Sequence, residues 1–187
     1  MRKQTQHTEL MDLISRRRTF TVVAVPLVIL ALARPTPLSM AIGLVMVALG
    51  QAVRLWASGY IHKESEVTTG GPYAYVRNPL YVGSFLISAG FAAMSAVWIS
   101  WLLIAVQYGL VYHLTVLAEE RRLEAILGEP YRQYRSAVPR WMPSLRPYPR
   151  RSGRFDRRQV AANKELSSMA VVGLACALFF VRLLWLK

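Results

Sequence analysis

Apolar residues are gathered into five long segments, which are separated by stretches rich in proline, tyrosine and arginine. The segments cover about 19–33, 38–60, 79–97, 98–117 and 167–185. Each is close to the ~20 apolar residues that an α-helix needs to cross the hydrocarbon core of a bilayer. The pattern predicts an all-α, polytopic membrane protein with about five transmembrane helices.

Local signals indicate where these helices end. Proline cannot continue a helix, so the residues "PTP" end the first segment. Only "MSAVWISW" separates the third segment from the fourth, which predicts a tight helical hairpin. Beyond the fourth segment, Leu123, Ile126 and Leu127 recur at helical spacing. We therefore expect the helix to continue as an amphipathic surface piece until Gly128 ends it.

Basic residues are distributed unevenly among the polar connections. The chain has 23 Lys and Arg against 10 Asp and Glu, a net charge of +13, and 54% of its residues are hydrophobic. Most basic residues precede the first segment or follow the second and fourth, and such loops stay in the cytoplasm. We expect a cytoplasmic N-terminus, in a bacterial inner membrane or a eukaryotic endoplasmic reticulum. The apolar segments favour anionic lipid over nucleic acid as the partner of this charge.

The stretch "GPYAYVRNPLYVG" stands at the start of the third segment. Its glycine permits close approach of the backbone, and Pro79 suits the first turn of a helix, whose N–H groups favour a carboxylate. Tyr73, Tyr75 and Tyr81 offer flat faces with hydroxyl tips, and Arg77 can grip a carboxylate or phosphate. These residues suit a small zwitterionic, nucleotide-like cofactor. They equally suit an interfacial aromatic belt beside a helix start.

A second stretch, "EERRLEAILGEPYRQYRSAVPRW", begins where the fourth segment leaves the membrane. Its carboxylates, Glu119 and Glu120, need a cationic partner beside the bilayer. Arg121 and Arg122 can supply it, and so can an amino or sulfonium group of a cofactor. His113 lies inside the helix about two turns earlier, as a candidate functional group or as a hydrogen-bonded core residue.

Several other kinds of site find no support in the sequence. The three histidines and one cysteine are scattered, so we expect no metal ligands. The single cysteine excludes an intramolecular disulfide. The glycines of "TTGG" are not followed by the Gly-Lys-Ser/Thr ending of a phosphate-binding loop.

The two stretches together resemble the isoprenylcysteine carboxyl methyltransferase family and the related phospholipid N-methyltransferases. Those membrane enzymes carry a G-x-Y-x-x-x-R-H-P-x-Y-x-G signature, followed after a helical hairpin by a glutamate pair and a V-P-R-like ending. The order, the spacing and the hairpin all match here. The resemblance covers about 55–143, within a single membrane domain of 1–187 that adds a basic linker, 144–166, and an extra C-terminal helix, 167–186.

This resemblance implies S-adenosylmethionine as cofactor, in a pocket on the cytoplasmic side. It implies direct transfer of the methyl group to a lipophilic acceptor from the bilayer, either an isoprenylcysteine-like carboxylate or a lipid amine. An amine must lose a proton, which Glu119, Glu120 or His113 could take. The candidate catalytic residues are Arg77, Glu120 and His113. The candidate cofactor-binding residues are Glu66, Val67, Thr68, Tyr73, Asn78, Pro79, Leu80, Tyr81 and Glu119.

Two positions depart from the family pattern. Asn78 replaces the signature histidine, and asparagine keeps a hydrogen bond but cannot carry a proton. Thr115 stands where isoprenylcysteine enzymes tend to place an acceptor-binding arginine. The sequence therefore leaves the choice between a carboxylate and an amine acceptor open.

Two other classes of protein are alternatives. Sterol reductases resemble this family in their C-terminal part, although they are much longer, so a nicotinamide-dependent membrane reductase is one. A non-catalytic adaptor that binds anionic lipid through the basic stretch 146–158 is the other, although a solvated linker explains that stretch equally.

The small residues near the start of the third segment bear on how an acceptor would enter. Gly83 and Ser84, with Gly90 deeper, leave little side-chain bulk and are expected to line a lateral opening to the bilayer. Small residues also let membrane helices pack closely, which is the alternative explanation.

Overall fold

The computed structural model describes residues 20–61 and 66–186, and all regular elements in these ranges are helical. This confirms the all-α prediction for the part of the chain described. The basic residues before position 20 and His62 to Ser65 lie outside it. The elements are Phe20–Leu32, α2 (Pro37–Ser58), the 3-10 turn η1 (Gly71–Ala74), α3 (Pro79–Ser95), α4 (Trp98–Val106), the π turn η2 (Gln107–Tyr112), α5 (His113–Leu127), α6 (Glu129–Ala137), α7 (Arg157–Ala162) and α8 (Glu165–Trp185).

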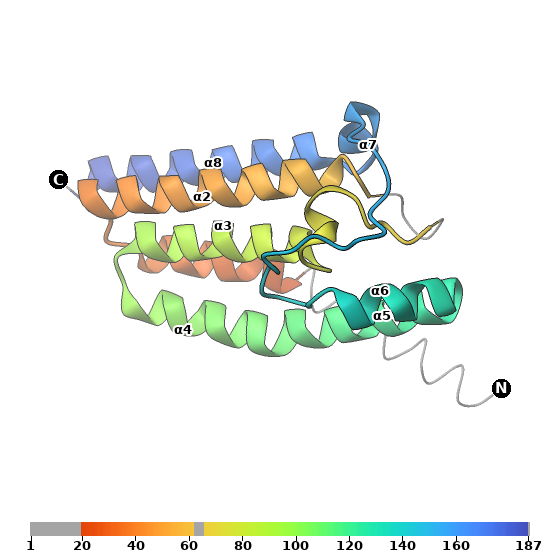
Figure 1. The fold of residues 1–187 in the computed structure, drawn as a ribbon. Coiled ribbons are helices and arrows are strands. Elements are labelled where there is room, and N and C mark those ends of the chain that lie inside the picture. The colour runs from red at the N-terminus through yellow and green to blue at the C-terminus, as the bar shows by residue number, and fades with distance from the viewer. Residues whose placement is uncertain (1–19, 62–65, 187) are drawn as a thin grey trace.

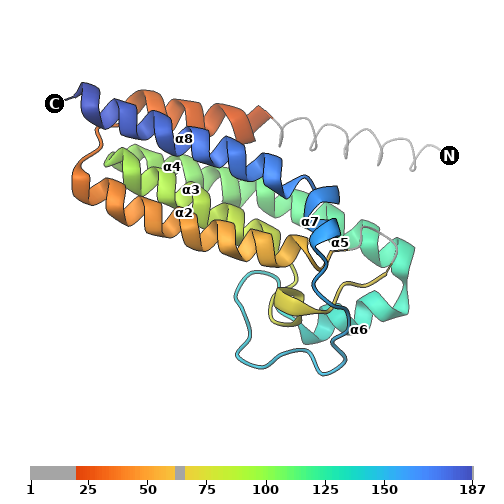
Figure 2. The same ribbon diagram turned by 90° about the horizontal axis from the view of Figure 1, so that it is seen from above.

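The apolar helices form an elongated bundle (Figures 1 and 2). Helix α3 packs against α2 and α4, and α8 contacts both α2 and α3. Three helices are long and apolar enough to cross a membrane, namely α2, the continuous helix Trp98–Leu127, and α8. Phe20–Leu32 and α3 are apolar but shorter. All five expected segments are therefore apolar helices, and three of them have the length that a membrane span needs.

The helix ends follow the local signals in the sequence. Thr36 caps α2 in a reciprocal pair of hydrogen bonds with Ser39, and Pro37 occupies the first helical position. The expected hairpin is confirmed, because α3 ends at Ser95 and α4 begins after the left-handed residue Ala96 (φ 54°) and one further residue. The fourth segment continues through η2 and α5, and Gly128 (φ 61°) ends it as predicted.

Four glycines bring the backbones of α2 and α3 into contact. A Cβ atom on Gly50 would lie 2.6 Å from the carbonyl oxygen of Gly83, and one on Gly90 would lie 2.7 Å from that of Gly43. Gly83 also lies against the side chain of Arg54. The lateral opening expected beside Gly83 and Gly90 is therefore wrong, because both glycines are covered by α2. Close helix packing explains them instead.

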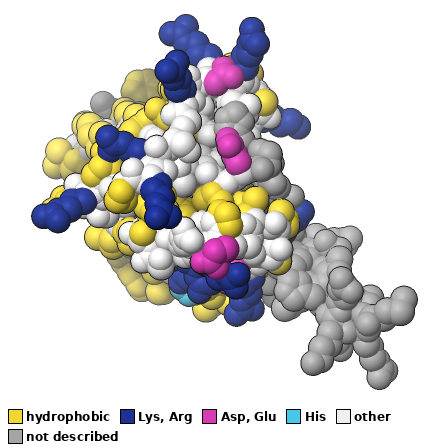
Figure 3. All heavy atoms as spheres, turned by 45° about the vertical axis from the view of Figure 1, so that its right-hand side comes forward, with side chains coloured by type: hydrophobic (Ala, Val, Ile, Leu, Met, Phe, Trp, Pro, Cys, Tyr) yellow, Lys and Arg dark blue, Asp and Glu magenta, His cyan; other side chains and the backbone are white. Residues whose placement is uncertain are grey.

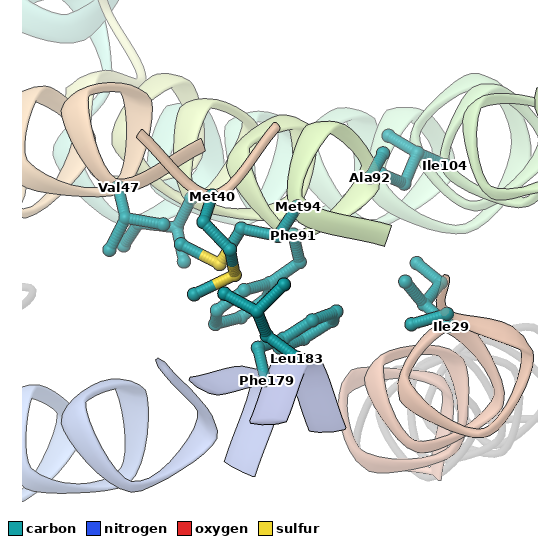
Figure 4. Close-up of a cluster of buried hydrophobic side chains, with 11 residues drawn as sticks. Ile29, Met40, Val47, Phe91, Ala92, Met94, Ile104, Phe179 and Leu183 are labelled. Carbon is teal, nitrogen blue, oxygen red and sulfur yellow. The ribbon is translucent and has the colours of Figure 1, made fainter. Parts of the chain in front are cut away.

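The apolar core adjoins this contact and includes residues of α8. Phe91 of α3 and Phe179 of α8 stack with ring centroids 5.7 Å apart (Figure 4). Leu183 of α8 and Met40 of α2 belong to the same buried cluster. Large apolar side chains on the outer helix faces are exposed, as lipid-facing residues of a multi-pass membrane protein are.

The glycine contact generates a prediction about stability. Alanine is normally preferred over glycine in a helix, but a Gly90→Ala methyl group would meet both the Gly43 carbonyl oxygen and the Val47 side chain at 2.7 Å. We expect Gly90→Ala to lower the free energy of unfolding by about 1–3 kcal/mol, as overpacked cores do. The control is Gly173→Ala on α8, where a Cβ atom would meet nothing within 4 Å. Thermal unfolding in detergent measures both, and equal midpoints would contradict the close contact.

Candidate functional site

Both sequence motifs lie at the same end of the bundle, opposite the C-terminus (Figure 1). Turn η1 and the first residues of α3 carry the first motif, and α5 and α6 carry most of the second. We call this the motif end. The structure therefore brings the two motifs together at one end of the bundle.

The segment 138–156 begins with the last residues of the second motif and runs back along the first. Its backbone pairs with that of the first motif, through the amide of Arg77 to the carbonyl of Pro139 (2.9 Å), Ser144 to Tyr75 (2.9 Å) and Tyr148 to Ala74 (2.8 Å). Near its end, the amide of Asp156 donates to the carbonyl of Gly59 (2.9 Å). Residues 144–156 of the expected basic linker expose their arginine side chains. Their backbone, however, is hydrogen-bonded to the motif end.

A buried carboxylate, Glu120, is the centre of the contacts between the motifs. It is 3% exposed, and its two oxygens accept hydrogen bonds from Nε and Nη2 of Arg140 at 2.8–3.1 Å. Arg77 Nε lies 3.5 Å from Oε1 of the same carboxylate. The hydrogen bonds to Glu120 raise the pKa of Arg140 above its ordinary value, so this guanidinium stays charged.

Asn78, at the position of the signature histidine, joins this cluster. It is the N-cap residue of α3, but its side chain makes no hydrogen bond to the helix start. Its amide nitrogen instead donates to Glu120 Oε1 at 3.2 Å and to the Arg140 carbonyl oxygen at 3.3 Å. A neutral amide with two donors suits these two acceptors.

Tyr81 and Glu119 form a second link between the motifs. The Tyr81 hydroxyl donates to Glu119 Oε1 at 2.8 Å. The Tyr81 ring meets Tyr112 edge to face at 5.5 Å, and Tyr112 stacks on Tyr108 at 4.3 Å within η2. Two expected cofactor-binding residues are thus in contact, and an aromatic column leads from them into the membrane-spanning part.

Tyr73 is a buried side chain whose hydroxyl has no hydrogen-bond partner among the described residues. Its backbone oxygen accepts from the Tyr134 hydroxyl at 2.8 Å, which holds η1 against α6. Burial raises the pKa of the Tyr73 hydroxyl well above its usual range, and the Glu119 charge adds to this. The group is therefore a neutral donor and acceptor, buried at the motif end and unused by its neighbours.

The remaining expected residues occupy the edges of this arrangement. Val67 packs beside Tyr131 and Tyr134, whereas Glu66 is exposed and Thr68 is half-buried. Pro79 is buried and Leu80 half-buried in the first turn of α3.

Two side chains of the long helix, His113 and Thr115, lie outside the cluster around Glu120. His113 stacks on Trp141 with ring centroids 6.3 Å apart, so it lies against the end of the second motif. Thr115, at the position expected for an acceptor-binding arginine, is buried and donates to the Val111 carbonyl oxygen at 2.7 Å. It therefore bonds its own helix.

A buried ion pair at this end was not predicted from the sequence. Arg54 of α2 pairs with Glu165 of α8 at 2.8 Å, and Gln51 donates to the same carboxylate at 2.7 Å. Gln51 and Arg54 were visible as polar residues within an apolar segment. Glu165 is 111 positions away from Arg54, so no local pattern pointed to it.

Metal binding finds no support in the part of the chain that the structure describes. Residues 20–61 and 66–186 contain no group of three or more His, Cys, Asp or Glu side chains placed to hold a metal ion. Carboxylate, amide and phenol groups, together with arginine, make up the chemistry of the motif end.

Three curated proteins are similar to parts of the chain. The cobalt-zinc-cadmium resistance protein CzcN of Cupriavidus metallidurans is 31% identical over 115 residues, which is 60% of this chain and 53% of that protein. The protein-S-isoprenylcysteine O-methyltransferase of Schizosaccharomyces pombe is 33% identical over 54% of this chain and 42% of its own length. The nickel-cobalt-cadmium resistance protein NccN of Alcaligenes xylosoxydans xylosoxydans is 30% identical over 56% of this chain and 49% of its own length.

The chain spans about half the length of these relatives. No solved structure matches it significantly. The profile of the phospholipid methyltransferase family matches residues 38–130, which include α2, the first motif, the hairpin and the glutamate pair. Residues 38–130 of this chain therefore belong to the phospholipid methyltransferase family, whose members are membrane methyltransferases that use S-adenosylmethionine.

Proposed function

We propose that this protein transfers the methyl group of S-adenosylmethionine to a lipophilic acceptor. The observation that carries the proposal is the buried Tyr73 hydroxyl, which has no hydrogen-bond partner among the described residues and lies at the same motif end as the Tyr81–Glu119 link. Leaving such a group unpaired costs about 1–3 kcal/mol, so a ligand that bonds it explains why it is there.

The residues of the motif end fit this cofactor chemically. The half-buried Glu119 carboxylate suits an amino or sulfonium group. The first turn of α3 presents the positive end of its helix dipole, which suits a carboxylate. The Tyr73 hydroxyl can bond a ribose or amino-acid oxygen. The bound cofactor supplies a methyl group already activated by its sulfonium.

Within this proposal, the roles of the expected catalytic residues are refined. Both oxygens of Glu120 already accept bonds from Arg140, and Asn78 adds another, so Glu120 orders the two motifs rather than accepting a proton. Arg77 acts with it, since it approaches Glu120 and donates to the Arg135 carbonyl oxygen at 3.3 Å. A carboxylate acceptor needs no base. An amine acceptor gives its proton to Glu119 or His113.

The acceptor is lipophilic because the proposed site lies where membrane helices end. Asn78 directly precedes α3, so a head group at this level leaves its tail in the hydrocarbon. The likeness to an isoprenylcysteine methyltransferase supports a carboxylate, and the phospholipid methyltransferase profile supports a lipid amine. Entry between α2 and α3 is closed by their glycine contact, so the acceptor approaches from another side of α3.

Exposed arginines surround the motif end (Figure 3). They support its proposed cytoplasmic orientation and contact with anionic head groups of the same bilayer. Between residues 94 and 186, the exposed basic residues are Arg121, Arg122, Arg132, Arg135, Arg146, Arg150, Arg151, Arg154, Arg157, Arg158 and Lys164.

Calorimetry with S-adenosylhomocysteine tests the cofactor and the role of Glu119. We expect the protein to bind this product but no reduced nicotinamide cofactor. Glu119→Gln should weaken binding about 10- to 150-fold, as the loss of a charge-assisted bond of about 1.5–3 kcal/mol does. Glu129→Gln, which changes an exposed carboxylate on α6, is the control. Binding of the nicotinamide alone would favour the reductase, and unchanged binding by Glu119→Gln would remove that residue from the site.

Removing the Tyr73 hydroxyl separates a ligand role from a structural one. Tyr73→Phe should raise the unfolding temperature of the ligand-free protein, because it removes a buried unpaired group. It should also weaken binding of S-adenosylhomocysteine by roughly 5- to 10-fold, the loss of about one neutral hydrogen bond.

Tyr134→Phe provides the contrast, since that hydroxyl is bonded to the Tyr73 carbonyl oxygen. It should lower the unfolding temperature. A Tyr73→Phe protein that binds as tightly as the wild type would show that the hydroxyl does not contact the cofactor.

A further inference from the structure

The Arg54–Glu165 pair is a charged contact between two membrane helices. Glu165 is 2% exposed, and the Arg54 side chain is 19% exposed. Arg54 meets the carboxylate with two parallel bonds, Nε to Oε1 at 2.9 Å and Nη2 to Oε2 at 2.8 Å. Charges in such positions are costly, so their presence in membrane helices points to a role beyond packing.

Hydrogen bonds continue from this pair to the proposed site. Arg54 Nη1 donates to the Ser84 hydroxyl at 2.6 Å, and that hydroxyl donates to the Leu80 carbonyl oxygen at 2.9 Å. Leu80 lies in the first turn of α3, beside Tyr81. An unbroken path therefore connects α8 with the turn that carries the candidate cofactor-binding residues.

The opposite end of α8 has a separate anchor. Arg182 donates to the carbonyl oxygens of Ala33 and Ala31, both at 3.3 Å, at the end of the helix Phe20–Leu32. This anchor lies away from the motif end, near the C-terminus (Figure 1). The two ends of α8 thus offer a matched comparison, with one anchor connected to the site and one not.

We infer that Glu165 is a positioning residue, which acts through Arg54 and Ser84 to fix the first turn of α3. The effect of this positioning on cofactor binding rests on the proposed function. Helix α8 lies outside the segment 38–130 that matches the family profile, so the inferred role of Glu165 rests on its contacts in this structure. With the carboxylate absent, Arg54 would lose two bonds and turn from Ser84, and the turn at Leu80 would loosen.

Two readouts test the inference, the dissociation constant of S-adenosylhomocysteine and hydrogen exchange at the amides of Tyr81 and Val82. These amides bond the Asn78 carbonyl oxygen and report on the first turn of α3 directly. Glu165→Gln and Ser84→Ala should each weaken binding about 2- to 30-fold, the range of residues that couple to a site without touching the ligand. Both should speed exchange at the two amides.

Stability is expected to behave differently from binding. Glu165→Gln leaves a buried cation unpaired and should lower the unfolding temperature, whereas the double variant Arg54→Met/Glu165→Gln removes both charges and should recover it. The double variant should still bind S-adenosylhomocysteine more weakly than the wild type, because the hydrogen bond from residue 54 to Ser84 stays absent. Arg182→Met should lower the unfolding temperature while leaving binding and exchange unchanged.

The outcomes separate this inference from the proposed function. A wild-type protein that does not bind S-adenosylhomocysteine would defeat the proposed function, and exchange at Tyr81 and Val82 would still decide the positioning role. Wild-type binding together with unchanged binding and exchange in Glu165→Gln and Ser84→Ala would overturn the inference. If Arg182→Met weakens binding of S-adenosylhomocysteine as much as Glu165→Gln does, Glu165 only anchors α8 in the bundle, and the inference is overturned.

Discussion

Glu120 is buried within α5, beyond the apolar part of the long helix, and its carboxylate needs compensation. An unpaired charge in such a place costs several kcal/mol, so the chain must bring cations to it. Arg140 arrives from the segment after α6, and Arg77 and Asn78 arrive from the first motif. Satisfying this carboxylate folds the second motif over the first and places segment 138–156 along η1. The contact between Tyr81 and Glu119 lies beside that closure.

The same constraint operates a second time between α2 and α8. Arg54 within an apolar helix is tolerated because Glu165, Gln51, Ser84 and Ser168 surround it with partners. Helix α3 lies between the two charged clusters, with Asn78 before its first residue bonded to one and Ser84 bonded to the other. The first turn of α3 is therefore held from both sides, which suits a surface that must meet a ligand with fixed geometry.

Features set by neighbouring residues could be predicted from the sequence. Pro79, Gly128 and the hairpin at Ala96 follow from local backbone preferences, and the structure has all three. Contacts between distant residues could not be predicted, because polarity alone does not choose a partner. Arg121 and Arg122 were candidates for the cations beside Glu120, whereas the structure brings Arg140 from 20 positions away. Gly83 shows a further limit, since a small side chain suits an opening and a tight contact equally, and only the position of α2 decides.

The π turn at η2 has a consequence for how the long helix can change. A π turn takes one residue more than an α turn to close, so η2 can lose one residue by tightening to an α turn, with little rotation of α5 relative to α4. Loss of a residue between η2 and Glu119 would instead rotate the glutamate pair by about 100°, since each residue of an α-helix turns the chain by that amount. Glu119 would then leave Tyr81, and Glu120 would leave Arg140, without any change of side chain. The number of residues between η2 and the glutamate pair is therefore fixed by the contacts of that pair, whereas η2 itself tolerates the loss of one residue.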